Sequence, residues 1–297
     1  MSSAPESNRD GPPALSVILP FRNDARHLPR QLEAPAQQEL PDRWEVVAVD
    51  DRSTDGSRAI AERFTGRLEI RVIASDGRGP AHARNVGARL ALGRRLVFVD
   101  ADDEVAPGYL AATADGLERF SFVTSAFDNR ALNAPWLAAA HRLQSRDPAD
   151  PLPRLFGLLP TAGGSIGVSR EAFEHAGGFP EEFGAAEDVA FSWNVQLAGF
   201  DLGYAAEAIL RLRYRRSLRA LFVQTFRWGS ALPALYRRYR PVGMEPRPLG
   251  RAVRLWLELA HGLASARTRA DLAPQVVRAG LLLGRLAGSV RHRTPYL

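Results

Sequence analysis

The chain has 297 residues, no cysteine and a formal net charge of +6, and 45% of its residues are hydrophobic. This size and composition suffice to bury a substantial core, so we expect one large folded domain, or one domain with an appendage. The lack of cysteine excludes a disulfide framework, a zinc–thiolate site and a thiol nucleophile. The excess of arginine suits nucleic acid, an anionic membrane surface or phosphate-bearing ligands, and charge alone does not choose among them.

The N-terminal leader, MSSAPESNRDGPPA (1–14), is polar and rich in proline, and we expect it to be disordered. It lacks the charged and then apolar order of a secretory signal, which predicts a cytoplasmic protein. No stretch reaches the roughly 18 consecutive apolar residues that a spanning helix needs. Contact with the surface of a membrane remains open.

Apolar runs and helical segments alternate through the first part of the chain. Strands are expected at 15–19, 45–49, 68–73 and 96–99, with a further one at 120–125, and helices from about 25 and over 59–64. The glycine-rich segment DGRGPAHARNVGARLA (76–91) is expected to open a third helix that ends near Gly93. This alternation predicts an α/β fold, with a Rossmann-like, mostly parallel sheet and helices on both faces. In such sheets ligands bind beyond the carboxyl ends of the strands.

The second part of the chain gives a less regular pattern. The proline-rich DPADPLPRL (147–155) is typical of a loop. Beyond Gly203 the sequence becomes rich in arginine and is expected to be helical, with amphipathic segments at 251–264 and 274–290. We place a boundary near Arg216, which gives a catalytic domain at 15–216 and a helical C-terminal region at 217–297.

Two acidic clusters follow predicted strands: Asp50 with Asp51, and Asp100 with Asp102 and Asp103. Because both clusters end strands of one sheet, they should converge on one crevice. Carboxylate oxygens suit magnesium or manganese, and such a metal stabilises the charge that develops on a departing diphosphate. Either cluster, taken alone, also fits a solvated turn or a helix cap.

Three further groups of residues are candidates for a site. Arg78 and Arg84 flank the start of a glycine-rich helix and could bind phosphate or base, although solvated arginines are the ordinary alternative. Glu187 and Asp188 open a helix, where a carboxylate serves either as a general base or as a helix cap. The sequence QTFRW offers Gln224, Arg227 and Trp228, suited to a diphosphate and a sugar ring or simply to packing.

In order along the chain, five motifs together resemble the family 2 glycosyltransferases of the GT-A fold. They are SVILPFRND, VVAVDDRSTDGS, GPAHARNVGARLALGRRLVFVDADD, GGFPEEFGAAEDVAF and QTFRW, and they cover about 15–228. The resemblance implies a GT-A domain with a helical C-terminal extension. It also implies a nucleotide-sugar donor and a Mn²⁺ or Mg²⁺ cofactor.

The resemblance also implies roles for single residues. Asp51 would contact the base, usually uracil, beside Pro20 and Arg22 in the nucleoside pocket. Asp100 would lie near the ribose and the metal, and Asp102 would bind the metal directly. In the pair Glu187 and Asp188, the latter would be the general base of an inverting displacement. Gln224, Arg227 and Trp228 match the QxxRW element, which is best known from processive synthases that also have membrane-spanning helices.

This chain departs from the family pattern at three points. It has no spanning segment, which favours transfer of one or a few sugars over polymerisation. Arg22 stands where the family often has tyrosine, and no histidine follows Trp228 at a convincing place for a metal ligand.

The acceptor remains open among a polysaccharide, a lipid-linked sugar and a small molecule. Leu255, Trp256, Leu281 and Leu282 on the basic tail could lie on an anionic membrane, or pack against the catalytic domain. Three alternatives to a transferase also stay open: a sugar nucleotidyltransferase, a nonenzymatic module that binds nucleic acid or a protein partner, and a degenerate transferase. Against the first, SVILPFRND has no glycine for a triphosphate loop; against the second, the acidic clusters would repel nucleic-acid phosphate.

Overall fold

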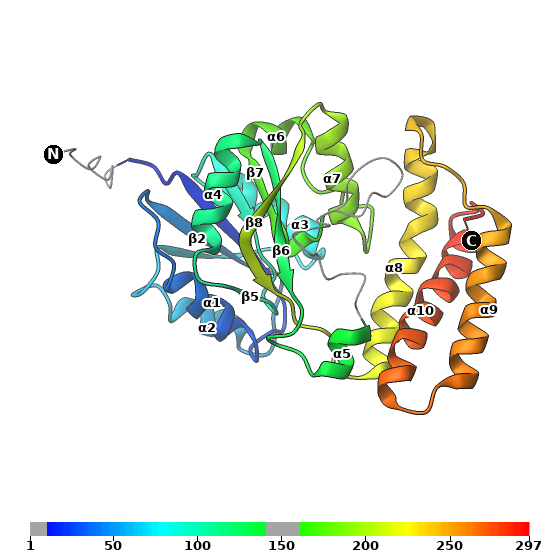
Figure 1. Cartoon of the computed structure of the whole chain (residues 1–297). Helices are drawn as coiled ribbons and strands as arrows, with labels where there is room; N and C mark the ends of the chain where they lie inside the picture. The colour runs from blue at the N-terminus through cyan, green and yellow to red at the C-terminus, as the bar shows by residue number, and fades with distance from the viewer. Residues whose placement is uncertain (1–10, 141–160, 297) are drawn as a thin grey trace.

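The computed structural model describes residues 11–140 and 161–296 (Figure 1). The proline-rich stretch at 147–155 and residues 1–10 of the expected leader lie outside the described residues. Residues 11–14 are held in place rather than disordered: Ala14 donates its N–H to the carbonyl of Arg43 at 2.8 Å, and Arg43 donates to the carbonyl of Gly11 at 2.7 Å.

Strands and helices alternate up to residue 211, and helices follow. The strands are β1 (Leu15–Phe21), β2 (Trp44–Asp50), β3 (Ile70–Ala74), β4 (Arg95–Phe98), β5 (Glu104–Val105), β6 (Phe122–Asp128), β7 (Ile166–Ser169) and β8 (Leu202–Arg211). The helices are α1 (Leu28–Ala36), α2 (Ser57–Glu62), α3 (Pro80–Leu90), α4 (Tyr109–Arg119), α5 (Pro135–Ala140), α6 (Arg170–His175), α7 (Glu187–Leu197), α8 (Leu218–Tyr239), α9 (Leu249–Ser265) and α10 (Arg269–Arg291), with short 3₁₀ turns at Gly163–Ser165 and Arg240–Val242.

The strands form one sheet in the order β3-β2-β1-β4-β7-β6-β8-β5. The first four strands are parallel, with Ile18 of β1 opposite Val47 of β2 and Phe98 of β4. Further along, β7 is antiparallel to β4 and β6, β6 and β8 are parallel, and β5 is antiparallel to β8. The predicted α/β fold with a mostly parallel sheet is confirmed.

Both faces of the sheet are covered by helices, as expected. Along β1, Leu15, Val17 and Leu19 point into the core under α1, α2 and α4. Ile18 points the other way, into the core under α3, α6 and α7. This alternation follows from the two-residue period of a strand, and both cores are apolar because the sheet is buried on both faces.

The expectation that the chain is helical from Gly203 is wrong for its first part. Residues Leu202–Arg211 form β8, which pairs with β6 at 202–205 and, after a bulge, at 209–211. The alanine-rich sequence GYAAEAIL has good helix propensity, but the sheet edge that β6 offers overrides this local preference. The helical part begins at Leu218, where the side chain of Ser217 accepts a hydrogen bond from the N–H of Ala220.

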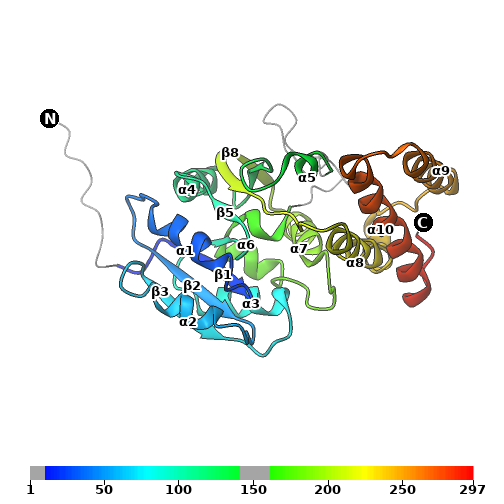
Figure 2. The same cartoon turned by 90° about the horizontal axis from the view of Figure 1, so that it is seen from below.

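Helices α8, α9 and α10 lie side by side at one end of the molecule (Figures 1 and 2). The closest packing joins α8 to α10 through glycines spaced four residues apart, Gly280, Gly284 and Gly288. A Cβ on Gly284 would lie 2.2 Å from the carbonyl oxygen of Phe226, so the backbones meet where no side chain fits. In the described part of the chain, no helix has the length and apolarity needed to cross a membrane.

Candidate functional site

A cleft of about 1130 Å³ opens at the carboxyl ends of the parallel strands, between the sheet and α8. Its lining includes twelve of the residues singled out from the sequence: Pro20, Arg22, Asp51, Arg84, Asp100, Asp102, Asp103, Glu187, Asp188, Gln224, Arg227 and Trp228. The predicted convergence of the two acidic clusters is therefore confirmed for Asp51, Asp100, Asp102 and Asp103. Asp50 and Arg78 do not line the cleft, and Arg78 is exposed and forms an ion pair with Glu181 at 2.6 Å.

The carboxylate of Asp51 organises the loop after β3. It accepts hydrogen bonds from the N–H groups of Gly77 and Gly79, both at 3.0 Å, and from the hydroxyl of Ser75. A guanidinium nitrogen of Arg22 lies 3.9 Å from one of its oxygens. The buried Asp51 thus fixes the wall of the cleft formed by the end of β1 and the loop at 75–79.

The loop after β1 is locked to the loop after β2. The side chain of Asn23 accepts from the N–H of Thr54 at 2.7 Å, and the N–H of Asn23 donates to the hydroxyl of Ser53 at 3.0 Å. Asp55 accepts from the N–H of Ala25 at 2.9 Å. The STDGS segment (53–57) therefore holds the rim of the cleft.

Asp100 and Asp102 approach the cleft from the turn after β4. The carbonyl of Asp100 accepts from Gln31 at 2.8 Å, which ties this turn to α1. One carboxylate oxygen of Asp102 lies 3.2 Å from Arg215. Burial and the nearby negative charge of Asp100 raise the pKa of Asp102, so a cation between the two carboxylates would relieve their repulsion.

Arg84 is buried and joins two of the acids. Its guanidinium donates to Asp100 at 2.7 Å and to Glu187 at 2.8 Å, and it lies 5.3 Å from the ring of Phe179. Because two carboxylates occupy these donors, Arg84 connects the turn after β4 to the start of α7. Its predicted contact with the donor stays a prediction.

Gly163 is a residue of the site that sequence reasoning missed. A Cβ there would lie 2.5 Å from Nη2 of Arg84, and one on the adjacent Gly164 would lie 2.9 Å from Oδ2 of Asp100. The N–H of Gly163 also donates to Asp188 at 2.9 Å. In the sequence, only the two adjacent glycines indicate this close approach, and two residues are too few to show a periodic pattern.

Asp188 lies half-buried at the start of α7, where its two oxygens accept from the N–H groups of Gly163 and Val189. Burial, with a smaller contribution from the charge of Glu187, raises the pKa of Asp188 to about 7. A carboxylate with a pKa near neutrality can accept a proton at that pH, as a general base must. Glu187 is buried and is held by Arg84.

The side of the cleft opposite the sheet is formed by α8. Arg227 and Arg219 are exposed on it, with Trp228 and Gln224 half-buried. The side-chain oxygen of Gln224 is buried and accepts no hydrogen bond from the described residues. The cleft thus places arginines opposite the carboxylates, which suits a ligand with a diphosphate and a metal between them.

The carboxylates of the cleft fit a divalent metal only when a bound molecule supplies further oxygen ligands. Among the described residues, no three Asp, Glu or His side chains gather closely enough to hold a metal ion by themselves. Asp100 and Asp102 each use one oxygen toward an arginine, which leaves the second oxygen for a cation. Oxygen ligands from a diphosphate and water would complete the shell of Mn²⁺ or Mg²⁺.

The fold is shared with solved glycosyltransferases. The chain is similar to the mannosyltransferase PcManGT from Pyrobaculum calidifontis, solved with GDP-Man and Mn²⁺, with a TM-score of 0.67 and 21% identity over 95% of this chain and 87% of that one. It is also similar to residues 1–349 of Staphylococcus aureus TarS, solved with UDP-GlcNAc, with a TM-score of 0.55 and 17% identity over 94% of this chain and 92% of that one.

Sequence relatives match shorter segments. The chain is 37% identical over 94 residues to the poly(ribitol-phosphate) β-N-acetylglucosaminyltransferase TarS of S. aureus strain Mu50, which is 31% of this chain and 16% of TarS. It is 33% identical over 150 residues to a validoxylamine A glucosyltransferase of Streptomyces hygroscopicus subsp. limoneus, which is 50% of this chain and 30% of that protein. The aligned segments thus span less than a third of these relatives.

The family model described as glycosyl transferase family 2 matches residues 16–177, more than half of the chain. This stretch contains β1 to β7 and both acidic clusters. The resemblance inferred from the motifs is therefore confirmed, and the chain belongs to glycosyl transferase family 2.

Proposed function

We propose that this glycosyltransferase is an inverting, metal-dependent enzyme that transfers a hexose-type sugar from a nucleoside diphosphate donor, a UDP-sugar, to an acceptor hydroxyl. The observation that carries the proposal is one cleft lined by Asp51, Asp100, Asp102 and Asp188, with Arg227 facing them. Neighbours of the same fold were solved with GDP-Man and with UDP-GlcNAc.

Each part of the donor has a counterpart in the cleft. The base would lie against Asp51, between Pro20 and Arg22, and the diphosphate would lie between the two carboxylates of the turn after β4 and Arg227 on α8. Asp100 and Asp102 would hold Mn²⁺ or Mg²⁺, which when bound supplies positive charge against the leaving diphosphate. Trp228 offers an apolar wall to the sugar ring.

The chemistry then needs a base on the acceptor side. Asp188 takes the proton from the acceptor hydroxyl while the oxygen of that hydroxyl forms a bond to the anomeric carbon. The bond from that carbon to the diphosphate oxygen breaks with its electron pair, so the anomeric configuration inverts in one displacement. The raised pKa of Asp188 matches this role, because the carboxylate of a weaker acid is a stronger base.

We also propose that the acceptor is a saccharide or a lipid-linked saccharide and that the protein works at the inner face of a membrane. The support is an exposed apolar face on α9, formed by Leu249, Val253 and Leu257. The membrane residues suggested by the sequence differ: Leu281 lines the cleft, Leu282 is buried, and Leu255 and Trp256 are half-buried. A nucleic acid is a poor candidate ligand, because carboxylates line the cleft.

The donor reaction can be tested without knowledge of the acceptor. Purified protein would be incubated with UDP- and GDP-sugars, with and without Mn²⁺, and the released nucleoside diphosphate measured. We expect slow, metal-dependent hydrolysis of one donor, abolished by Asp102→Ala and retained by Asp115→Ala, which removes an exposed acid of α4 outside the cleft. Hydrolysis that needs no metal, or that survives Asp102→Ala, would overturn the metal role.

A further inference from the structure

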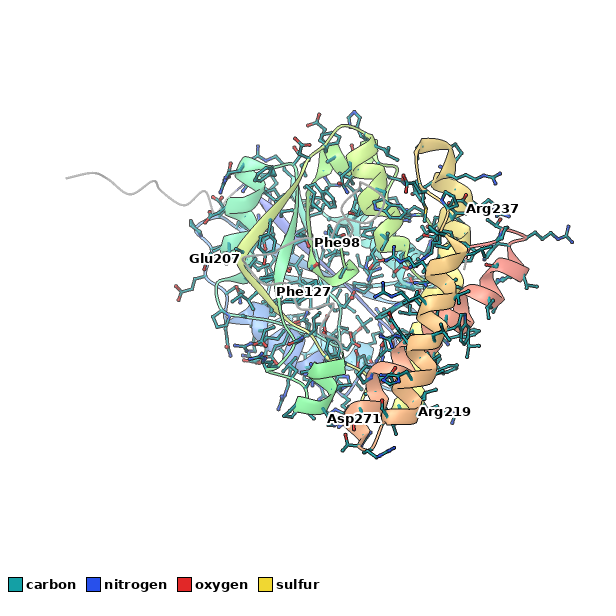
Figure 3. All side chains as sticks on the ribbon, turned by 45° about the vertical axis from the view of Figure 1, so that its right-hand side comes forward. Phe98, Phe127, Glu207, Arg219, Arg237 and Asp271 are labelled. Atoms are coloured by element: carbon teal, nitrogen blue, oxygen red, sulfur yellow. The ribbon has the colours of Figure 1, made fainter. Side chains whose placement is uncertain are left out.

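The helices α8, α9 and α10 together form the helical unit of the molecule. Arginines gather at the end of this unit where α8 ends, α9 begins and α10 ends. In Figure 3 the labelled Arg237 marks this end of α8, and Arg219 marks the opposite end. Residues 237–254 and 285–293 contain a single acidic residue, Glu245. The arginines in these two segments are Arg237, Arg238, Arg240, Arg247, Arg251, Arg254, Arg285, Arg291 and Arg293.

Within this group, Arg285 is buried, and no acidic side chain among the described residues forms an ion pair with it. Its side chain is 9% exposed, and its Nε donates to no acceptor among the described residues. The Nε of Arg247 is buried and unsatisfied in the same way, and its guanidinium lies 5.9 Å from the ring of Tyr296. Glu258, an acid on the adjoining helix α9, pairs instead with Arg254 at 2.8 Å and Arg278 at 3.7 Å.

The cluster is electrostatically unfavourable as it stands. Burial, followed by the charges of Arg247 and Arg251, lowers the pKa of Arg285 to about 10, so the guanidinium is still charged at neutral pH. A buried charge without a partner costs free energy, and an anion that accepted its hydrogen bonds would offset that cost. The arrangement is therefore incomplete until an anion binds.

The start of α9 adds two features that indicate the source of the anion. Its first turn contains no acidic side chain, and free N–H groups at a helix start attract phosphate. One side of α9 presents Leu249, Val253 and Leu257, which are 72%, 58% and 66% exposed, and Arg251 lies on another side of the same first turn. A helix start that carries both exposed apolar residues and arginines suits the boundary between lipid headgroups and acyl chains.

We propose that Arg247, Arg251 and Arg285 form a binding site, distinct from the donor cleft, for the phosphate group of an anionic lipid. The apolar face of α9 would enter the acyl region while the guanidinium groups hold the headgroup. The site specifies the membrane contact proposed above, but its affinity for phosphate can be measured without a membrane and without any sugar transfer.

The test uses the full chain in two arms. In one, sedimentation measures binding to vesicles of phosphatidylcholine alone or mixed with phosphatidic acid; in the other, calorimetry measures binding of inorganic pyrophosphate. We expect binding to the vesicles that contain phosphatidic acid, no binding to phosphatidylcholine alone, and binding of pyrophosphate. Arg285→Gln and the exposed variant Arg251→Gln should each weaken both kinds of binding about tenfold, as the loss of a charge-assisted hydrogen bond implies. Arg89→Gln removes the same charge from the exposed side of α3 and serves as the matched control.

Each of the following three results would overturn one part of the proposal. Equal losses in Arg89→Gln and Arg251→Gln would mean diffuse charge attraction and no site. Binding of pyrophosphate without binding of vesicles would overturn the lipid source. Binding to neutral vesicles at the same strength would overturn the phosphate contact. Donor hydrolysis by the same variants separates these failures from failure of the proposed transferase reaction.

Discussion

At the scale of the residue, Asp188 gives the transferase proposal a pH dependence. A general base must be deprotonated, and the pKa of Asp188 is raised to about 7. Below that pH the active fraction falls about tenfold per pH unit, so kcat/KM should rise as the pH increases through 7 and then level off. Initial rates at constant ionic strength measure this.

The control for this profile is Asp188→Asn, which keeps a side chain of similar size that cannot accept the proton. It should remove most of the activity and leave no break near pH 7 in what remains. Binding of the nucleoside diphosphate, measured by calorimetry, should be unchanged. A wild-type profile that breaks near pH 4, the ordinary range of a carboxyl group, would contradict the assignment.

Gly163 provides a second prediction at this scale. Gly163→Ala would place a Cβ 2.5 Å from the guanidinium of Arg84, which must then move away from Asp100 and Glu187. We expect kcat to fall about 10- to 100-fold, because displaced groups lose their alignment with the reacting atoms. Gly184→Ala is the matched control, since it lines the same cleft and its Cβ would meet nothing within 4 Å. Equal activities would show that Arg84 does not position the acids.

The acids at the ends of the strands could be predicted from the sequence, because each follows an apolar run that ends in a charged turn. Asp51 and Asp102 are such residues, and both line the cleft. The partnership of Arg84 with Glu187 could not, since it joins α3 to α7 through the folded sheet and leaves no local pattern. Gly163 was missed for the same reason.

At the scale of the element, the packing of α8 on α10 depends on small residues. Gly284→Ala would bring a Cβ to 2.2 Å from the carbonyl of Phe226, and the helices would have to separate. We expect the free energy of unfolding to fall by about 1–3 kcal/mol, the usual cost of overpacking. Urea denaturation followed by circular dichroism measures the change.

Gly250→Ala is the control for this prediction. Its Cβ would meet nothing within 4 Å, and it lies in the first turn of α9. Alanine restricts the unfolded chain more than glycine does, so this variant should gain about 0.4–1 kcal/mol. If both variants lost stability equally, the close contact between α8 and α10 would not be the reason.

Elements with strong periodicity were predicted within a few residues, and short or paired ones were not. The amphipathic segments at 251–264 and 274–290 correspond to α9 and α10, of which α10 starts earlier, at a capping box formed by Thr268 and Asp271. The two-residue strand β5 and the four-residue strand β7 exist through their pairing with β8 and β4. Such strands are too short to show a period of their own.

At the scale of the whole molecule, the cleft joins the sheet to the helical unit. Its lining takes Asp51 and Asp100 from one side and Gln224 and Arg227 from α8 on the other. A donor that binds there as proposed would contact both parts, so its binding free energy should stabilise the folded state against their separation as well as against local opening. The proposed boundary near Arg216 thus falls between two parts that one ligand would hold together.

Hydrogen exchange can detect this coupling. With saturating nucleoside diphosphate and Mn²⁺, amides of α8 around Gln224 and Arg227 should exchange more slowly, together with those of the loop at 75–79. The far side of α9 should not change, because it does not line the cleft. Protection confined to the loops of the sheet would mean that α8 takes no part in donor binding, and the roles proposed for Gln224, Arg227 and Trp228 would then fail while those of Asp51 and Asp102 stood.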